Sequence, residues 1–511
     1  MGTWFERLSS LDSLFLELED RTAHMHVGAV AVFEGKAPPY RDFLQLVEAR
    51  LHQVPRYRQR VQFVPFKQGR PVWIDESQFD LEYHVRHTAL PAPGGDEELK
   101  RLAGRLFSQA LDRDKPLWEL WLVEGWGGDG SAGDGQTPKA GASGDRFAII
   151  SKTHHCMLDG ISGVDLATVL LDTEPSTEAP AAPAEWKPRP APKTSELLVT
   201  SLKEQITNPI QVVREALQSN NDARKLLREI AGGVKPLLGL AGMGMAPASA
   251  LNRPIGPHRR FEMLDLPLPE IRKIRRALRG TVNDVILAVV AGALRRWLEA
   301  KGESLGPDLR ALVPVSMRGA HDRNTFGNQV SAVFCPVPVA EANPVERLRK
   351  VREAMKGIKE GGQAVAAAAL ASLSDFAPPT LLAQAARLQA VTRFFNLVIT
   401  NVPGPQFPLY LLGRQLRGCY PQVPLAAQQS IGVALLSYHG KVCVGLLADL
   451  DVRDLAALGG AMRASLDELL AATEAAPEPE APGTPAPVSS REPRAAVREP
   501  IPADPARTPG I

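Results

Sequence analysis

Hydrophobic and polar positions along this 511-residue chain follow the two periods that mark helices and strands. Apolar residues three and four apart predict helices at 40–54, 96–111, 282–298 and 455–469. Strand-forming runs predict strands at 25–35, 147–152, 308–318, 328–339 and 395–404. The run SIGVALLSYHGKVCVGLLAD predicts a hairpin with His439 and Gly440 at its turn. Helices and strands alternate along the chain, so the pattern predicts an α/β protein.

Three stretches lack this pattern and divide the chain. Residues 127–145 are Gly-rich and predict a surface loop between two strands of one hairpin. Residues 173–194 are dense in Pro and Ala and predict a linker, and the Pro- and Ala-rich end of the chain has too few large apolar groups to fold. Since 511 residues exceed one hydrophobic core, we expect an N-terminal domain at 1–172, a linker with connecting helices at 173–256, a C-terminal domain at 257–472 and a disordered tail at 473–511.

Charge and composition narrow the classes of function. The formal net charge is +2, without the basic excess typical of nucleic-acid binding. The four cysteines are scattered, and no secretory signal or apolar run of about 18 residues is present, so we expect a cytoplasmic protein. A basic amphipathic helix expected at 222–240 either lies on a membrane surface or packs on the protein itself, so contact with the inner membrane surface or with lipid droplets stays open.

The candidate chemistry is concentrated at 147–171, FAIISKTHHCMLDGISGVDLATVLL, which predicts a strand, a tight turn and a helix. Adjacent side chains in a strand point to opposite faces, so His154 and His155 cannot address the same point. One histidine faces a site, and the other is fixed by residues on the opposite face of the strand. Asp159 and Gly160 follow at the turn.

The spacing HHxxxDG resembles the motif of acyl-CoA-dependent acyltransferases of the chloramphenicol acetyltransferase-like fold. Four further segments occur in order: PLW (Pro116, Leu117, Trp118), ND (Asn283, Asp284), PVSMR (314–318) and NVPGP (401–405). Together they are similar to the bacterial wax ester synthase/diacylglycerol acyltransferase family, over roughly residues 8–470. The resemblance implies two related domains with mixed sheets, and an active site in a tunnel between them.

The resemblance also implies roles for individual residues. His155 would be the general base of a direct transfer without an acyl-enzyme, since a neutral imidazole with a pKa of about 6.5 suits this task. His154 would support it, and Asp159 would brace the turn by pairing with Arg318, where Gly160 lets the chain bend. The substrates implied are acyl-CoA with diacylglycerol or a long-chain fatty alcohol, with no cofactor and no metal.

Two predicted groups of site residues have alternatives. Asn283 either donates a hydrogen bond to the thioester oxygen, beside Asp284, or caps its helix. Pro116, Leu117 and Trp118 either contact the acyl chain or belong to the core.

Other functions stay open at this stage. Cys156 as a nucleophile is disfavoured, because a Cys–His pair is normally built from distant segments. A metal site at His154, His155, Cys156 and Asp159 is disfavoured by the opposed histidines. An acyltransferase with another acceptor, or a non-catalytic lipid-binding or lipid-droplet protein on the same scaffold, are the remaining alternatives.

Overall fold

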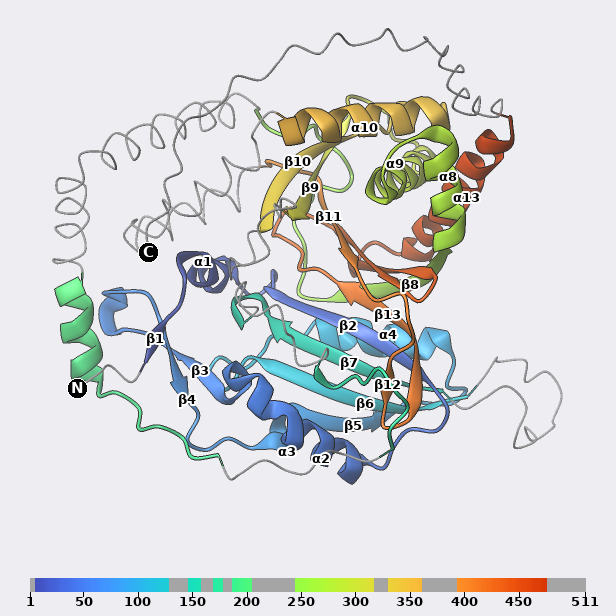
Figure 1. Ribbon diagram of the computed structural model, residues 1–511. Coiled ribbons are helices and arrows are strands. Elements are labelled where there is room, and N and C mark those ends of the chain that lie inside the picture. The colour runs from blue at the N-terminus through green and yellow to red at the C-terminus, as the bar shows by residue number, and fades with distance from the viewer. Residues whose placement is uncertain are drawn as a thin grey trace, which may run out of the picture.

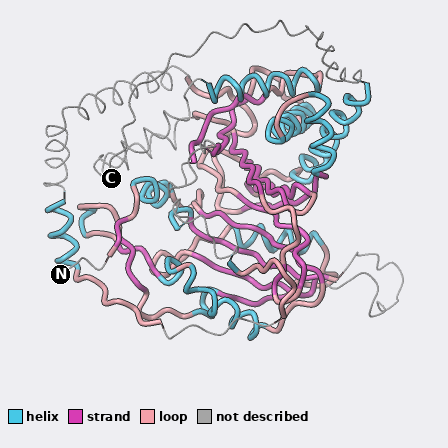
Figure 2. Tube along the Cα trace, in the orientation of Figure 1, coloured by secondary structure: helices cyan, strands magenta, loops and turns pink. Residues whose placement is uncertain are grey.

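The computed structural model describes residues 5–127, 146–157, 169–177, 186–204, 244–316, 330–360 and 393–475. Two six-stranded mixed sheets form its centre, and helices flank them (Figures 1 and 2). A smaller antiparallel sheet contains β1 (Glu6–Arg7), β4 (Val72–Asp75) and β3 (Gln59–Gln62). The α/β class with mixed sheets is therefore confirmed.

The first large sheet carries the histidine pair. Its order is β12 (Tyr410–Leu411), β13 (Arg414–Gln422), β2 (His26–Glu34), β7 (Arg146–His154), β6 (Trp118–Trp126) and β5 (Val85–Ala89). Only β5 and β6 are parallel neighbours, and β6 and β7 form the antiparallel pair expected around the Gly-rich stretch. The helices of this half are α1 (Ser10–Leu18), α2 (Tyr40–Arg50), α3 (Leu81–His84) and α4 (Asp96–Phe107).

The second large sheet has the order β10 (Val330–Val337), β9 (Leu309–Ser316), β11 (Leu397–Pro403), β14 (Ile431–Tyr438), β15 (Lys441–Asp449) and β8 (Arg259–Pro267). Its helices are α8 (Leu268–Leu278), α9 (Val282–Ala300), α10 (Pro344–Glu360) and α13 (Leu455–Ala475), which pack together on one side (Figure 1). From Asp284 to Leu294 every residue of α9 is buried, as its apolar sequence predicts. At the β14–β15 turn, His439 and Gly440 have φ values of 42° and 81°, which suits a tight hairpin.

Strand β13 joins the two halves of the chain. It pairs with β2 from Leu416 opposite Phe33 to Gln422 opposite Gly28. The first sheet is therefore completed by a strand that comes later in the sequence than four strands of the second sheet, β8 to β11. The sequence places this segment in the C-terminal domain and predicts no strand there. Periodicity within a strand carries no information about a partner almost 400 residues away, which is why the pairing was missed.

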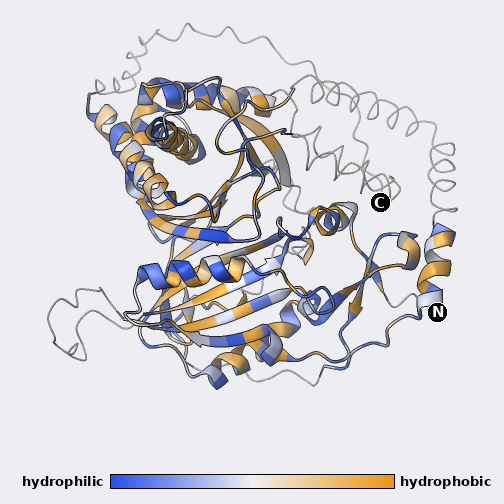
Figure 3. Cartoon of the chain, turned by 180° about the vertical axis from the view of Figure 1, so that it is seen from behind, coloured by the Kyte–Doolittle hydropathy of each residue, from blue (hydrophilic) through white to orange (hydrophobic). Residues whose placement is uncertain are grey.

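A shared hydrophobic core also connects the two halves. It contains Val30 of β2 and Leu99 of α4 from the first half, with Phe261 of β8 and Leu447 of β15 from the second. Figure 3 shows hydrophobic residues along the strands, whereas the helices carry hydrophobic and hydrophilic residues together. The first sheet, and the site on it, is thus held against the second sheet by buried apolar contact.

Among the described helices, none alone is long and apolar enough to cross a membrane; α8 and α9 taken together meet that test of length and composition, with a bend of 102° between them.

Candidate active site

The strand β7 delivers the histidine pair to a fixed turn. His154 is its last residue, and a short 3₁₀ turn, His155–Met157, follows. The backbone N–H of His154 donates to the carbonyl of Leu117 at 2.9 Å, and that of His155 donates to the carbonyl of Met25 at 2.8 Å. The backbone of the PLW segment therefore holds the end of the strand that carries the site.

The ring of His154 is fully buried, at 1% exposure, and both its nitrogens have neighbours. Nδ1 accepts a hydrogen bond from the backbone N–H of Cys156 at 3.2 Å, so the ring proton of the neutral form lies on Nε2. Nε2 points to Oε2 of Glu19, at the long distance of 3.4 Å. His154 is held from behind, as the sequence predicts for one member of the pair.

Glu19 is a buried carboxylate at the end of α1. Arg113 donates to its Oε2 from Nη2 at 2.7 Å and from Nε at 3.1 Å. Burial raises the pKa of Glu19, but His154 and Arg113 outweigh burial and hold that pKa below its usual range. Glu19 is therefore charged beside His154 at neutral pH.

His155 faces away from this pair and is half-buried. Its ring stacks on Phe15 of α1, with 3.9 Å between ring centroids and 24° between ring planes. Burial lowers the pKa of His155 to about 4, partly offset by a hydrogen bond to its own backbone and reinforced by His154. The pKa of His155 therefore lies below the unperturbed imidazole value of about 6.5, and the sequence does not reveal how far the ring is removed from water.

A neutral imidazole has one unprotonated ring nitrogen, which can accept a proton. With a pKa of about 4, the ring is neutral at pH 7. It can act as a general base.

Cys156 contacts His154 more closely than its sequence position suggests. Its Sγ lies 2.9 Å from Nδ1 of His154, a contact within one segment that the prediction against a Cys–His pair did not anticipate. The thiol is 2% exposed, and burial raises its pKa well above the usual value. A protonated, buried thiol is a poor nucleophile, and His154 is already engaged by Glu19.

The side chains of the PLW segment are buried. Leu117 and Trp118 are each 1% exposed, and Nε1 of Trp118 donates to the carbonyl of Tyr57 at 2.8 Å. The indole stacks on His84, with 4.6 Å between centroids. Pro116 is buried with them. Trp118 therefore lies in the core of the first half, which is one of the two alternatives that its sequence left open.

Two motifs from the second half meet at the start of α9. Nδ2 of Asn401, on β11, donates to Oδ1 of Asn283 at 3.1 Å. The helix cap is Thr281, whose Oγ1 accepts from the N–H of Asp284, while Oδ2 of Asp284 accepts from the N–H of Thr281. The alternative of Asn283 as the cap is therefore wrong: Asp284 and Thr281 close a capping box.

This arrangement leaves the Asn283 amide able to donate. Its Oδ1 is used by Asn401, and within the part of the chain that the structure describes its Nδ2 makes no hydrogen bond. The side chain is half-buried at the end of the helix. An amide held in this way can donate to an oxygen that becomes negative.

Several predicted features lie outside the described residues: Asp159, Gly160, Arg318, the Gly-rich residues 128–145, the helix at 222–240 and the tail. Over the described ranges, no three His, Cys, Asp or Glu side chains form a metal-binding group.

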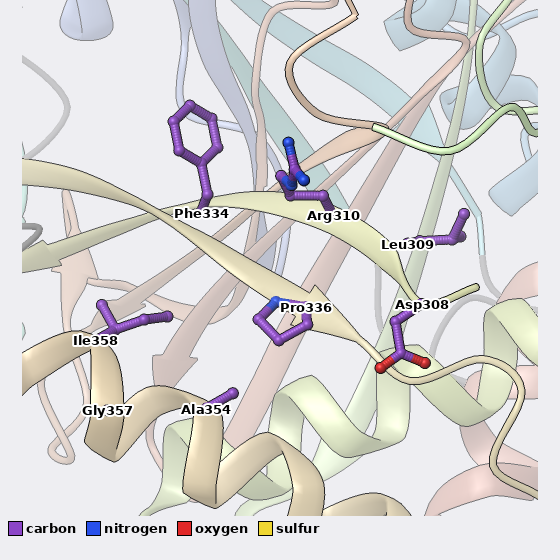
Figure 4. A pocket seen from close by; sticks show the side chains of 8 residues that line it. All are labelled: Asp308, Leu309, Arg310, Phe334, Pro336, Ala354, Gly357 and Ile358. Carbon is purple, nitrogen blue, oxygen red and sulfur yellow. The ribbon is translucent and has the colours of Figure 1, made fainter. Parts of the chain in front are cut away.

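A pocket of about 390 Å³ lies at the edge of the second sheet, between β9, β10 and α10 (Figure 4). Its described lining residues are Asp308, Leu309, Arg310, Phe334, Pro336, Ala354, Gly357 and Ile358. None of them is a predicted site residue.

Sequence reasoning missed the residues behind the histidines. Phe15 and Glu19 are four apart, which places them on one face of α1, but such spacing equally fits any helix with a buried face. Arg113 lies in a segment without periodicity. Only the fold brings these three residues to β7.

Solved structures similar to this chain define its class. A wax ester synthase/diacylglycerol acyltransferase from Marinobacter aquaeolei VT8 is 28% identical, with a TM-score of 0.61, covering 92% of this chain and 100% of that one. The TRI3 trichothecene 15-O-acetyltransferase from Fusarium sporotrichioides shares the fold at 12% identity, with a TM-score of 0.54, covering 93% and 96%. The fold and the histidine pair are those of a chloramphenicol acetyltransferase-like acyltransferase.

Family models narrow the class further. The wax ester synthase/diacylglycerol acyltransferase catalytic domain matches residues 8–132 and 140–286, and the C-terminal domain of that family matches residues 326–470. The probable diacylglycerol O-acyltransferase tgs1 of Mycobacterium tuberculosis H37Rv is 35% identical over 452 residues, covering 87% of this chain and 91% of the relative. The chain belongs to the wax ester synthase/diacylglycerol acyltransferase family and is an acyltransferase, as its motifs indicate.

Proposed function

We propose that this protein transfers a long-chain acyl group from acyl-CoA to the hydroxyl of diacylglycerol, of a long-chain fatty alcohol, or of both, with His155 as the general base. The observation that carries the proposal is the state of His155: neutral, half-buried and stacked on Phe15, next to a fully buried partner. Relatives named as diacylglycerol O-acyltransferases support the acceptor.

The proposed reaction is a single displacement. The unprotonated ring nitrogen of His155 takes the hydroxyl proton while the hydroxyl oxygen attacks the thioester carbonyl carbon. The new C–O bond forms, the C–S bond breaks, and the imidazolium returns its proton to the CoA thiolate. Because a thioester is already an activated acyl donor, the proposed step needs no cofactor and no acyl-enzyme.

Asn283 is the proposed donor to the thioester oxygen as it becomes negative. Its capped helix and its hydrogen bond from Asn401 fix the amide before substrate arrives, and such fixed donors are effective because they need no reorganisation. Since His155 and Asn283 belong to different halves of the chain, we propose that acyl-CoA and acceptor meet in a tunnel between the halves.

The test is acceptor-dependent release of free thiol from palmitoyl-CoA, measured with hexadecanol and with a diacylglycerol. We expect thiol release that requires an acceptor, with wax ester or triacylglycerol as the matching product. Thiol release that is equal with and without acceptor would indicate hydrolysis, and the absence of release would favour another acceptor or a lipid-binding protein.

We also propose a cytoplasmic protein that attaches peripherally to a lipid surface, such as the inner membrane or a lipid droplet. All four cysteines have free thiols, which suits a reducing compartment. The loop between β3 and β4 exposes Phe66 to 85% and Phe63 to 38%, and its sequence contains Lys67 and Arg70 and no acidic residue. Exposed aromatic rings beside basic residues suit an anionic lipid surface.

Replacing Phe66 by Ser should weaken sedimentation of the protein with anionic phospholipid vesicles severalfold, because a large apolar ring no longer enters the interface. Phe407→Ser is the matched control: its ring is also exposed, at 51%, but lies on the loop after β11. Equal loss in both variants, or in neither, would contradict docking through the β3–β4 loop.

A further inference from the structure

We infer that α1 is a positioning element of the active site, in which Phe15 holds the ring of His155 and Glu19, with Arg113, holds the ring of His154. This inference rests on the proposed function of His155. It assigns roles to residues that had none in the sequence analysis.

The helix α1 packs directly on the turn that carries the pair. Its N-cap is Ser9, whose side chain accepts from the N–H of Asp12, and it ends at Leu18, with Glu19 as the C-cap. Phe15 and Glu19, one helical turn apart, face the residues 154–157. Leu11, one turn before Phe15, is 48% exposed. The contact to both histidines is therefore confined to the last turn of the helix.

Phe15 controls the orientation of His155 and its access to water. The stacked contact of 3.9 Å covers one face of the imidazole and restricts rotation of the ring. The same coverage contributes to the burial of the ring, and burial is the main cause of its low pKa. Without this side chain, the ring would gain rotational freedom and hydration together.

Glu19 acts on the other histidine. Its carboxylate accepts from Arg113 and faces the Nε2–H of His154, which fixes the tautomer in which Nδ1 accepts from Cys156. Arg113 also donates to the carbonyl of Leu16 at 3.0 Å, so the guanidinium ties the carboxylate to its own helix. A buried charge is costly unless it is paired. The arrangement of Arg113, Glu19 and His154 in which the carboxylate contacts both partners is therefore the one of lowest free energy.

The connection continues through the backbone. His154 and His155 are consecutive, and the N–H of His154 is held by Leu117 and that of His155 by Met25. A change in the ring of His154 therefore moves the turn that carries His155, while a change at Phe15 acts on His155 itself. Misplacement by a fraction of an ångström is enough to lower kcat.

The first test is the pH profile of kcat/KM between pH 5 and pH 8 for Phe15→Ala, with palmitoyl-CoA and the preferred acceptor. The wild-type protein should show no acid limb in this range, because the pKa of His155 is about 4. The variant should acquire a limb as that pKa rises toward about 6.5. Its kcat at pH 7.5 should fall roughly tenfold.

Leu11→Ala is the control on the same helix. It removes a comparable apolar side chain that is 48% exposed, one turn further from the histidines, and should leave both the profile and kcat unchanged. If Phe15→Ala merely destabilised the fold, its melting temperature would fall without an acid limb. A folded Phe15→Ala protein with the wild-type profile would overturn the role of Phe15.

The second test is Glu19→Gln, which keeps the size of the side chain and removes its charge. We expect kcat to fall roughly tenfold while KM for palmitoyl-CoA stays within a factor of two, because orientation and not binding is lost. Arg113→Lys, which keeps the positive charge, should recover part of kcat relative to Arg113→Ala. A wild-type kcat in folded Glu19→Gln would overturn the role of Glu19.

A direct titration separates this inference from the proposed function. If the wild-type protein transfers no acyl group, the function fails, but the pKa of His155 can still be followed by NMR of the ring Cε1–H. A raised pKa in Phe15→Ala, and not in Leu11→Ala, would then support the positioning role. Equal pKa values in both variants would overturn it.

Discussion

Replacing His155 by Ala should lower acyl transfer by about 10²- to 10⁴-fold, the range over which a general base contributes. In the structure, no described side chain lies ready to replace it: His154 is engaged with Glu19 and Cys156 on the other face. The hydroxyl of a lipid alcohol is a weak nucleophile until its proton is removed, so the loss should fall on kcat. Thiol release from palmitoyl-CoA, with circular dichroism to verify the fold, measures it.

His87→Ala provides the control for this loss. His87 lies on β5 of the same sheet, stacks on Tyr40 and has an exposed side chain, so its removal should leave transfer unchanged. Retention of more than about a tenth of the wild-type rate in folded His155→Ala would be too much for the loss of a general base and would assign the proton transfer elsewhere.

The second large effect is expected at the junction of the two sheets, in Gly445→Ala. Gly445 lies in β15, and a Cβ built on it would overlap the carbonyl oxygen of Pro421 in β13 and come within 3.2 Å of Phe261. A backbone carbonyl cannot move aside as a flexible side chain would. We expect a loss of roughly 3 kcal/mol or more in the free energy of unfolding, the upper end for overpacking.

Urea unfolding measures this loss, and Gly460→Ala is the matched control. Gly460 lies in α13, with nothing within 4 Å of a Cβ there, so the same change should stabilise the protein by about 1 kcal/mol through helix propensity. Opposite signs for the two glycines would identify the close approach of β15 and β13 as the cause. A loss below about 1 kcal/mol in Gly445→Ala would show that the strands can separate without cost.

The local elements were predictable because their signals are local. The apolar run of α9, the His439–Gly440 turn and the stripe of α13 each agree with the structure. Strands β8 and β13 were not predicted, and β13 contains Gly418 and Pro421, both poor strand formers. The position of β13 beside β2 depends on hydrogen bonding between the two halves of the chain. The sequence of one strand does not specify its partner.

The site was predictable only in part for the same reason. The histidine pair was predictable, and His154 is the buried member, but His155 lies in the 3₁₀ turn after β7, so strand alternation does not set its direction. The sequence of α9 also contains the signal for its cap: Thr281 and Asp284 have the spacing of a capping box, with Asp in place of Glu. This signal would have excluded Asn283 as the cap residue. The low pKa of His155 and the partners Phe15, Glu19 and Arg113 depend on tertiary packing.

The place of β13 has a consequence for synthesis of the protein on the ribosome. Glu34 ends β2 and Arg414 begins its partner β13, so the ribosome adds 380 residues (414 − 34) from the end of β2 to the start of β13. At about 5–20 residues per second, the outer edge of β2 waits on the order of 20 to 75 seconds for its partner. An unpaired edge is a template for aggregation. Nascent chains of this protein therefore have an interval in which chaperone protection of β2 decides the yield.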